Sequence, residues 1–357
     1  MLCARDATLN TYRRNTLLDT VRGAALCGIV FINAAYYSAP TSVPGELSNV
    51  ESLVSHAWSL LFAGKFFTLF SFLFGAGLQI FLARSQLRHE RFFFRYLRRA
   101  CGLYALGTLH SLVWPSDIIV GYVTISLLIM WLYLVSLNQL KLTLVGLFTA
   151  SVCVTLLPAD SGLFGFVAGT AYKVLPFVAG MYVARINGFE YLAAQGRRLA
   201  KYWVISGVVI VGFVAGYVGW IMSGVTASQA NAYINLTGYP MAVCYFLVLA
   251  CLHGSLFLNC LSTGWALLGR MSLTLYLTQD SLGRWLISLM DIAPLQPSFV
   301  PLVAVAVLGL QLGFCVLWLR YFRAGPCEWL ISRVAHGGVK SGSGPVCASC
   351  GPGSGLA

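Results

Sequence analysis

Histidine and aspartate in one short stretch of the chain are the residue types that could perform acid–base chemistry. His110 lies near the end of an apolar segment, and Asp117 follows it by seven residues with Pro115 between them. Proline breaks a helix, so we expect both side chains to lie near the same end of the segment. A neutral imidazole held by a carboxylate is how proteins build a general base. The alternative is a histidine that only bonds a backbone carbonyl at a helix end.

A polar stripe on the first apolar segment, near residues 17–37, is a second candidate. Arg22 and Asn33 are eleven residues apart, close to three turns of an α-helix, and Asp19 lies near the same stripe. Ionisable side chains are expensive to expose to lipid, so the stripe must face the interior of a helix bundle. Either Asp19 and Arg22 pair with each other at i,i+3, or Arg22 binds a ligand.

Two further apolar segments carry polar side chains. Lys65 lies near the start of the segment 58–83, where its ammonium group either extends to the outer interface or contacts a ligand. On the segment 264–286, Ser272, Tyr276 and Gln279 follow an i, i+4, i+7 pattern and line one helix face. A helix this polar must be central to the bundle, either through interhelical hydrogen bonds or through function. Its other polar residues are Arg270, Asp280 and Arg284.

The composition says where these residues must sit. The 357 residues are 58% hydrophobic and only 10% charged, and the mean hydropathy is +0.79. Soluble domains are about one-quarter charged, so a membrane protein is expected, with the lipid bilayer as its partner. The net charge of +12 lies in short clusters between apolar runs, and no aromatic-and-basic module accompanies it, so no nucleic-acid partner is expected.

About ten segments are long and apolar enough to cross a bilayer, which takes about 20 residues in a helix. We therefore predict an all-α, polytopic transmembrane helix bundle of about ten helices in the inner (plasma) membrane. The segments lie near 17–37, 58–83, 100–115, 118–137, 142–158, 163–184, 203–222, 237–259, 264–286 and 298–321. The turn around Trp114–Asp117 is predicted to be either a tight connection or a re-entrant feature. The run from Leu17 carries charges and no convincing cleavage site, so it is predicted to be a spanning helix and not a signal peptide.

Lysine and arginine predict the orientation. They gather before the first segment and in 84–99, 185–201 and the C-terminal stretch, whereas 38–52, 159–162, 223–236 and 287–297 contain neither. Cytoplasmic loops carry the excess of these residues, so both termini are predicted to be cytoplasmic.

The chain divides into a transmembrane domain over 1–335 and a tail over 336–357. The tail is rich in Gly, Ser, Pro and Cys, and such a composition cannot bury a core. Most cysteines lie in apolar segments, where they behave as small hydrophobic residues. Cys347 and Cys350 form a CxxC in the tail, which is a weak metal signal without a second pair, and we expect neither a metal nor a bound cofactor.

Four blocks of residues resemble the YeiB-like family (domain of unknown function 418), over most of residues 13–335. In chain order these blocks are Leu17–Gly23 with Gly28, Ile29 and Asn33; Lys65–Phe66 with Leu69–Gly77; Leu109–His110 with Trp114, Asp117, Ile118 and Tyr122; and Gly269–Thr274 with Gly325, Pro326, Glu328 and Trp329. Three positions depart from the family pattern: Ser116 stands for a glycine, Leu275 for an asparagine and Cys327 for a leucine.

The resemblance implies acyl transfer. The family is similar to a wider group of membrane acyltransferases that includes the heparan-α-glucosaminide N-acetyltransferases, which move an acetyl group from cytoplasmic acetyl-CoA to an acceptor with a membrane-embedded histidine. For this chain it implies His110 as general base and Asp117 as its orienting partner. Acyl-CoA is the implied co-substrate, and the acceptor is a hydroxyl or amine of an envelope glycan, a lipid or a small molecule.

Residues expected to contact the acyl donor or the acceptor follow from the same comparison and from the polar stripes. They are Arg22, Asn33, Lys65, Tyr122, Arg270, Tyr276 and Gln279. The arginines of 84–99 either receive the phosphates of CoA or act only as a topology signal. Two other functions fit the polar stripes: a transporter or exporter of a small molecule, and a non-catalytic membrane assembly partner.

Overall fold

The computed structural model describes residues 16–37, 49–88, 91–155, 162–195, 200–224, 233–234, 237–253, 259–293 and 295–337. These residues form helices and connecting turns, without a strand among them. The all-α prediction is confirmed to that extent.

The helices, in chain order, are α2 (Thr16–Ala34), α3 (Asn49–Phe62), α4 (Lys65–Leu87), α5 (Phe92–Ser111), α6 (Ile119–Ile129), η1 (Met130–Tyr133), α7 (Leu137–Thr155), α8 (Gly162–Arg185), α9 (Gly188–Gln195), α10 (Ala200–Met222), α12 (Gly238–His253), α13 (Asn259–Arg270), α14 (Ser272–Met290), η3 (Pro297–Phe299), α15 (Val300–Tyr321) and α16 (Pro326–His336). Most of the 336–357 tail, with its CxxC, lies outside the described residues.

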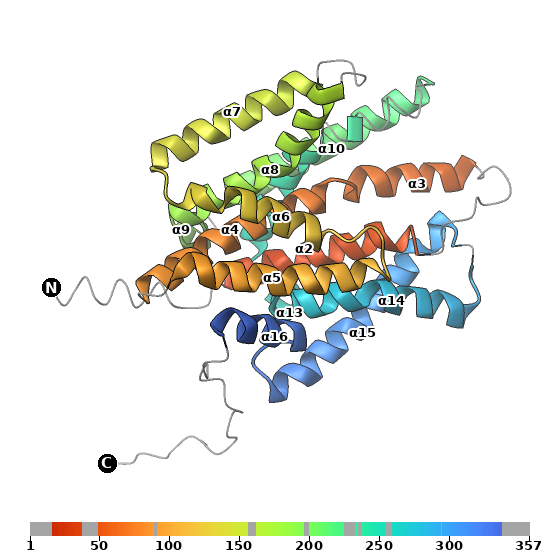
Figure 1. Ribbon diagram of the computed structural model, residues 1–357. Coiled ribbons are helices and arrows are strands. Elements are labelled where there is room, and N and C mark those ends of the chain that lie inside the picture. Colours follow the sequence, from red (N-terminus) through yellow and green to blue (C-terminus); the bar gives the residue numbers. More distant parts are fainter. Residues whose placement is uncertain are drawn as a thin grey trace, which may run out of the picture.

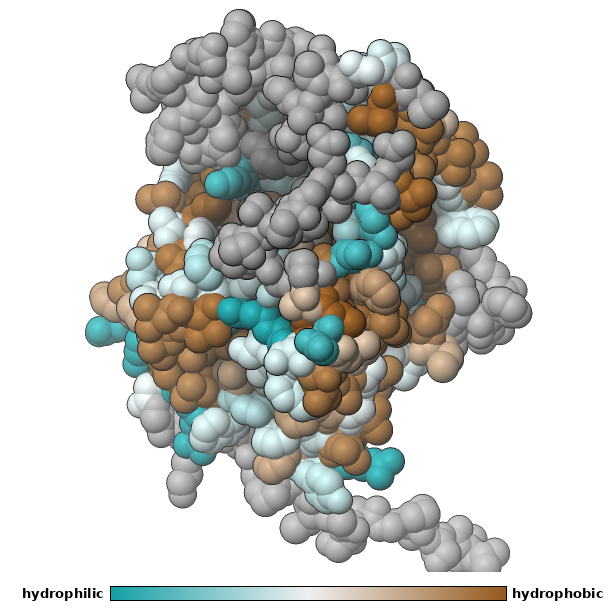
Figure 2. All heavy atoms as spheres, turned by 90° about the vertical axis from the view of Figure 1, so that its right-hand side faces the viewer, coloured by the Kyte–Doolittle hydropathy of each residue, from teal (hydrophilic) through white to brown (hydrophobic). Residues whose placement is uncertain are grey.

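Four helical stretches in the described part of the chain are long and apolar enough to cross a membrane. They are Thr16–Ala34, Val50–Leu87, Lys201–Ile221 and Pro297–Tyr321. Ile119–Tyr133 and Gly238–His253 are apolar but shorter. Apolar side chains cover broad areas of the surface in Figure 2, as expected of a protein that contacts lipid. The chain therefore has the character of a membrane protein, while the count of ten crossings stays a prediction.

The bundle is held by glycines at two helix crossings. A Cβ atom on Gly23 of α2 would lie 1.8 Å from the Trp265 carbonyl oxygen of α13, and one on Gly269 would lie 1.8 Å from that of Asp19. Gly75 of α4 and Gly180 of α8 approach each other's helices in the same way, with a Cβ 1.9 Å from a carbonyl oxygen in each case. Without a hydrophobic driving force in lipid, small residues let helices approach closely. Gly23, Gly75 and Gly269 belong to the sequence blocks described above, and together with Gly180 they allow these helices to approach closely.

The segment predicted as one helix over 264–286 is two helices, and that prediction is corrected. α13 ends at Arg270 and α14 begins at Ser272. The start of α14 is capped by the Glu328 carboxylate of α16, which accepts the backbone N–H of Leu273 at 2.7 Å and that of Thr274 at 3.2 Å, and the Thr274 hydroxyl at 2.6 Å. A helix start leaves backbone donors without intrahelical partners. Glu328 satisfies two of them, and this explains why the fourth sequence block has two distant halves.

Lys65 also differs from its prediction. The helical stretch begins at Asn49, earlier than the predicted residue 58, and Gly64 breaks it with a φ of 77°. Lys65 therefore starts α4 in the interior and is fully buried, so its side chain does not extend to an interface. Its ammonium group donates to the Ile234 carbonyl at 3.1 Å.

Candidate functional site

His110 and Asp117 come together at the junction of α5 and α6. His110 lies in the last turn of α5, and its Nδ1 is 2.9 Å from Oδ1 of Asp117. The other carboxylate oxygen accepts the backbone N–H groups of Ile119 at 2.9 Å and Val120 at 3.2 Å. Asp117 is thus fixed by the start of α6, and it holds the imidazole in one orientation.

Tyr276 of α14 adds to the same carboxylate. Its hydroxyl donates to Oδ1 of Asp117 at 3.2 Å and receives the backbone N–H of Ile118 at 3.1 Å. Its ring lies beside the imidazole of His110, with centroids 5.4 Å apart. Asp117 therefore accepts from three donors besides its contact with the imidazole.

A second carboxylate lies on the other side of the imidazole. Oδ2 of Asp280, on α14, is 3.4 Å from Nε2 of His110, and Oδ1 accepts the Asn33 side-chain amide at 3.1 Å. Asp280 is fully buried and His110 is 8% exposed. In the sequence, Asp280 is only one of several polar residues of its helix. The spacing could not pair it with His110, because the two are 170 positions apart and only the crossing of α5 and α14 brings them together.

A cavity of about 560 Å³ leads from one end of the bundle toward this cluster. Along α4 its wall runs from Phe70 to Arg88, which is about 27 Å of helix at 1.5 Å per residue. The cavity is also lined by Ile118, Ile119, Tyr122 and Tyr276. His110 does not line it, so Tyr276 and the start of α6 separate the imidazole from the cavity.

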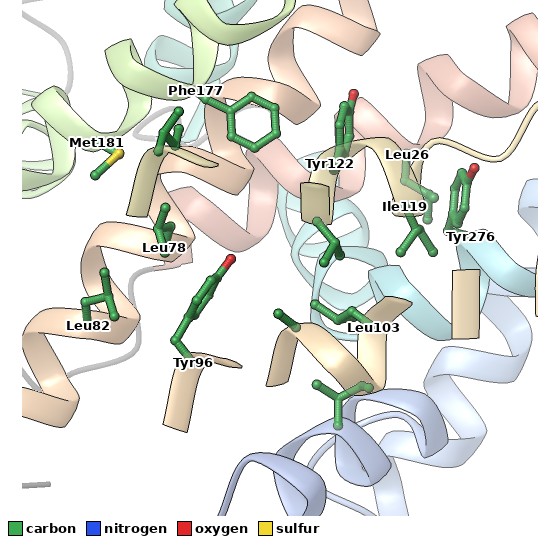
Figure 3. Close-up of a cluster of buried hydrophobic side chains, with 14 of the residues drawn as sticks. Leu26, Leu78, Leu82, Tyr96, Leu103, Ile119, Tyr122, Phe177, Met181 and Tyr276 are labelled. Carbon is green, nitrogen blue, oxygen red and sulfur yellow. The ribbon is translucent and has the colours of Figure 1, made fainter. Parts of the chain in front are cut away.

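The wall of the cavity is apolar at its inner part. Five lining residues also belong to the largest buried hydrophobic cluster among the described residues: Leu78, Tyr96, Leu103, Ile119 and Tyr122. Figure 3 shows Ile119, Tyr122 and Tyr276 close together, with Leu103 and Tyr96 beyond them. An extended apolar chain would find dry surroundings here.

The outer part of the lining is strongly cationic. Six arginines line the cavity: Arg22, Arg84, Arg88, Arg95, Arg99 and Arg270. Two carboxylates accompany them. Asp19 pairs with Arg22 at 3.4 Å, and Glu328 is engaged by the start of α14. Arg95 contacts His336 of α16, which also lines the cavity. The side chains of the protein thus leave an excess of positive charge at this end.

Four of the predicted donor- or acceptor-binding residues line the cavity. Arg22 both pairs with Asp19 and faces the cavity, so the two alternatives for it are compatible. Arg270 donates to the Arg323 carbonyl at 3.3 Å, and Tyr122 donates to the Phe67 carbonyl at 3.0 Å. Tyr276 closes the inner end.

The other predicted residues lie elsewhere. Asn33 holds Asp280, and Lys65 bonds Ile234. Gln279 is fully buried, and neither atom of its amide has a hydrogen-bond partner. Their predicted contacts with a substrate stay untested predictions.

Comparison with known proteins agrees with the sequence blocks. Residues 183–338 match the family described as "Protein of unknown function (DUF418)". The chain is 27% identical to the uncharacterized protein YeiB of Escherichia coli, over 89% of this chain and 95% of that one. Over these residues the chain is similar to the YeiB-like DUF418 family.

Relatives in other bacteria have similar lengths. The uncharacterized protein YxaH of Bacillus subtilis is 25% identical over 90% of this chain and 94% of its own. An uncharacterized 39.9 kDa protein in the amylase 3′ region of Bacillus acidopullulyticus is 26% identical over 88% and 91%. No solved structure matches. The names of these relatives state no activity.

Proposed function

We propose that this YeiB-like protein is a membrane acyltransferase that moves an acyl group from acyl-CoA to a hydroxyl or amine acceptor. One observation carries the proposal: an arginine-lined cavity leads to Tyr276, and Tyr276 bonds the carboxylate that holds His110. The inner end of the proposed donor cavity and the candidate general base are thus separated only by Tyr276 and the start of α6.

The proposed topology has about ten crossings in the inner membrane, with both termini in the cytoplasm. The arginine-bearing ends of α4 and α5 and the helix α16 lie toward the same end of the bundle (Figure 1). Basic residues favour the cytoplasmic side, which supports a cavity that opens to the cytoplasm, where CoA is found.

The cationic end of the cavity suits the phosphates of the donor. Guanidinium groups bind phosphate oxygens through paired hydrogen bonds, and six arginines exceed the two carboxylates that line the cavity with them. The apolar inner wall would then hold the arm that carries the thioester. The whole cavity wall runs about 27 Å along α4, from Phe70 to Arg88 at 1.5 Å per residue, so a donor held by the arginines would extend toward Tyr276.

The proposed reaction needs one proton carrier. Nε2 of His110 takes the proton of the acceptor hydroxyl while the oxygen attacks the thioester carbonyl carbon. The carbon–sulfur bond breaks, and the same proton passes to the sulfur, so no further reactant is consumed. Asp117 keeps a proton on Nδ1 throughout and stabilises the imidazolium that forms. Arg22 and Arg270 line the same cavity, and we propose them as the cationic groups that stabilise the oxyanion.

The test is direct. Purified protein is incubated with radiolabelled acetyl-CoA and a crude envelope extract, and transfer of label to an acceptor is measured. Each of the single variants Arg88→Ala and Arg99→Ala should raise KM for acetyl-CoA and leave kcat nearly unchanged. The reason is that these arginines would bind the donor away from the reacting atoms. Lys141→Ala, on α7 and outside the cavity lining, is the matched loss of a positive charge. Absence of label transfer with any envelope extract would contradict the proposal.

A transporter is the second candidate. Two buried carboxylates flank the buried His110, and chains of Asp, Glu and His in membrane proteins also conduct protons in transporters. This function predicts proton-coupled uptake or efflux in reconstituted vesicles and no acyl transfer by the wild-type protein.

A further inference from the structure

His110 is held between two carboxylates that have unequal surroundings. Asp117 accepts from the backbone N–H groups of Ile119 and Val120 and from the Tyr276 hydroxyl, and its Oδ1 lies 2.9 Å from Nδ1 of His110. Three donors other than the imidazole thus occupy this carboxylate, which offers about four acceptor positions. We assign the proton of the neutral ring to Nδ1 of His110, which then fills the fourth position.

The opposite side of the ring is incomplete. Nε2 of His110 and Oδ2 of Asp280 are both buried without a well-formed hydrogen bond, and the Tyr37 hydroxyl lies near the same carboxylate. Nε2 and Oδ2 face each other at 3.4 Å. If neither carried a proton, two lone pairs would face each other in a dry interior, which is unfavourable because buried polar atoms need partners. One proton between them removes the conflict.

We propose that Asp280 is a positioning residue that shares one proton with Nε2 of His110 and keeps that proton when the acceptor binds. The inference rests on the proposed function and names a residue that acts through the candidate general base. Before the acceptor binds, the shared proton occupies Nε2 and His110 cannot act as a base. When the acceptor hydroxyl reaches Nε2, it displaces the Asp280 carboxyl from that nitrogen: the shared proton stays on Asp280, and the single lone pair of Nε2 accepts the acceptor hydroxyl instead.

The proton balance closes. The acceptor proton moves to Nε2, the acceptor oxygen forms its bond to the acyl carbon, and the carbon–sulfur bond breaks. Nε2 then gives this proton to the sulfur, while the proton on Asp280 stays where it is. After the product leaves, Asp280 and Nε2 share their proton again, and the site is ready for the next cycle.

Asn33 gives Asp280 its orientation. The Asn33 amide donates to Oδ1 at 3.1 Å, which turns the other oxygen, Oδ2, toward His110. An amide bond to one oxygen leaves the second as the place for the shared proton. Asn33 thus has a defined role although it does not line the cavity.

The pair can be tested without any activity. Thermal unfolding of the purified protein is measured for His110→Ala, Asp280→Ala and the double variant. Coupled residues give non-additive changes, so we expect the double variant to lose less in Tm than the sum of the two single losses. The control pair is His110→Ala with Thr278→Val, because the Thr278 hydroxyl donates only to carbonyls of its own helix. For this pair the Tm loss of the double variant should equal the sum of the two single losses. Asp280→Asn, which keeps the side-chain volume, replaces Asp280→Ala if the alanine variant does not fold.

Kinetics tests the role in the reaction. Asp280→Asn should lower kcat about 10²-fold, at the lower end of the range for loss of a general base, with KM for acetyl-CoA unchanged. Thr278→Val should leave both constants unchanged. An additive cycle, or an Asp280→Asn enzyme with wild-type kcat, would overturn the inference. A non-additive cycle in a protein without any acyl transfer would support the pair and refute the proposed function, so the two failures are distinguishable.

Discussion

At the scale of single residues, the chemistry depends on how His110 is held. Its two ring nitrogens face two aspartates on different elements, at 2.9 Å for Asp117 and 3.4 Å for Asp280. A histidine that only satisfied a helix end would need one backbone carbonyl and no carboxylate. The described contacts favour the functional interpretation over that structural one.

Removal of the imidazole should abolish the reaction without loss of the fold. His110→Ala should lower the rate of acyl transfer by about 10²–10⁴-fold, the usual contribution of a general base, while binding of acetyl-CoA persists because the arginine end is untouched. Equilibrium binding and single-turnover transfer, measured on the same preparation, separate the two effects. A His110→Ala protein with full transferase activity would end the catalytic assignment.

Asp117→Asn should have a smaller effect on transfer than His110→Ala. The amide would still accept from Ile119 and Val120, so the start of α6 should persist, but it would no longer stabilise the imidazolium. The comparison of kcat values for the two variants, with Tm as the measure of folding, checks this order. A larger loss for Asp117→Asn at unchanged Tm would mean that Asp117 is itself the base.

How much of this site could be predicted depends on sequence distance. His110 and Asp117 are seven positions apart, so a break after α5 was enough to predict their contact. Asp280 and Asn33 are joined by helix crossings, and no local pattern contains that information. Lys65 was misplaced for a related reason: an apolar run shows where a helix can lie in lipid, but not that Gly64 interrupts it in the interior.

At the scale of elements, glycines and one cap set how the helices meet. Gly23 and Gly269 bring α2 against α13, and Glu328 fastens α16 to the start of α14. Both contacts border the cavity, because Asp19, Arg22, Gly269 and Glu328 belong to its lining. The position of the arginine-lined end of the cavity therefore depends on these contacts.

Loss of the cap should loosen α16. Glu328→Gln keeps the shape but weakens two backbone hydrogen bonds and one to Thr274, which are charge-assisted in the wild type. We expect a loss of stability of about 1–3 kcal/mol and a weaker affinity for acetyl-CoA, measured by thermal unfolding and equilibrium binding. Glu190→Gln on α9, outside the cavity lining, is the matched control and should leave donor affinity unchanged.

A methyl group at the α2–α13 crossing should separate the two helices. In Gly269→Ala, the new Cβ would lie 1.8 Å from the Asp19 carbonyl oxygen, so the backbones must shift, at a cost of about 1–3 kcal/mol. Gly212→Ala on α10 is the control, because a Cβ there meets nothing within 4 Å. Equal melting temperatures for the two variants would show that the close approach contributes nothing.

At the scale of the whole molecule, hydropathy predicts where apolar helices lie better than how many cross the membrane. The predicted segments overlap helices throughout the described residues, because burial in lipid demands long apolar runs. The ends differ where local chemistry decides. α13 and α14 separate at Met271, and α13 has only 12 residues. α6 continues as the short 3₁₀ helix η1, and the stretch Ile119–Tyr133 is shorter than the four long apolar stretches.

Orientation is the remaining question at this scale, and α10 decides it. α10 is among the four stretches long and apolar enough to cross a bilayer, with the basic segment 185–201 before it and the segment 223–236, without Lys or Arg, after it. In a cysteine-free background, Gln195→Cys should react only with a membrane-permeant thiol reagent in intact cells, and Ser223→Cys also with an impermeant one. The positive-inside bias demands this order. If both cysteines were protected from the impermeant reagent, the ten-helix topology would fail, and the cavity would have to be assigned a side of the membrane on other grounds.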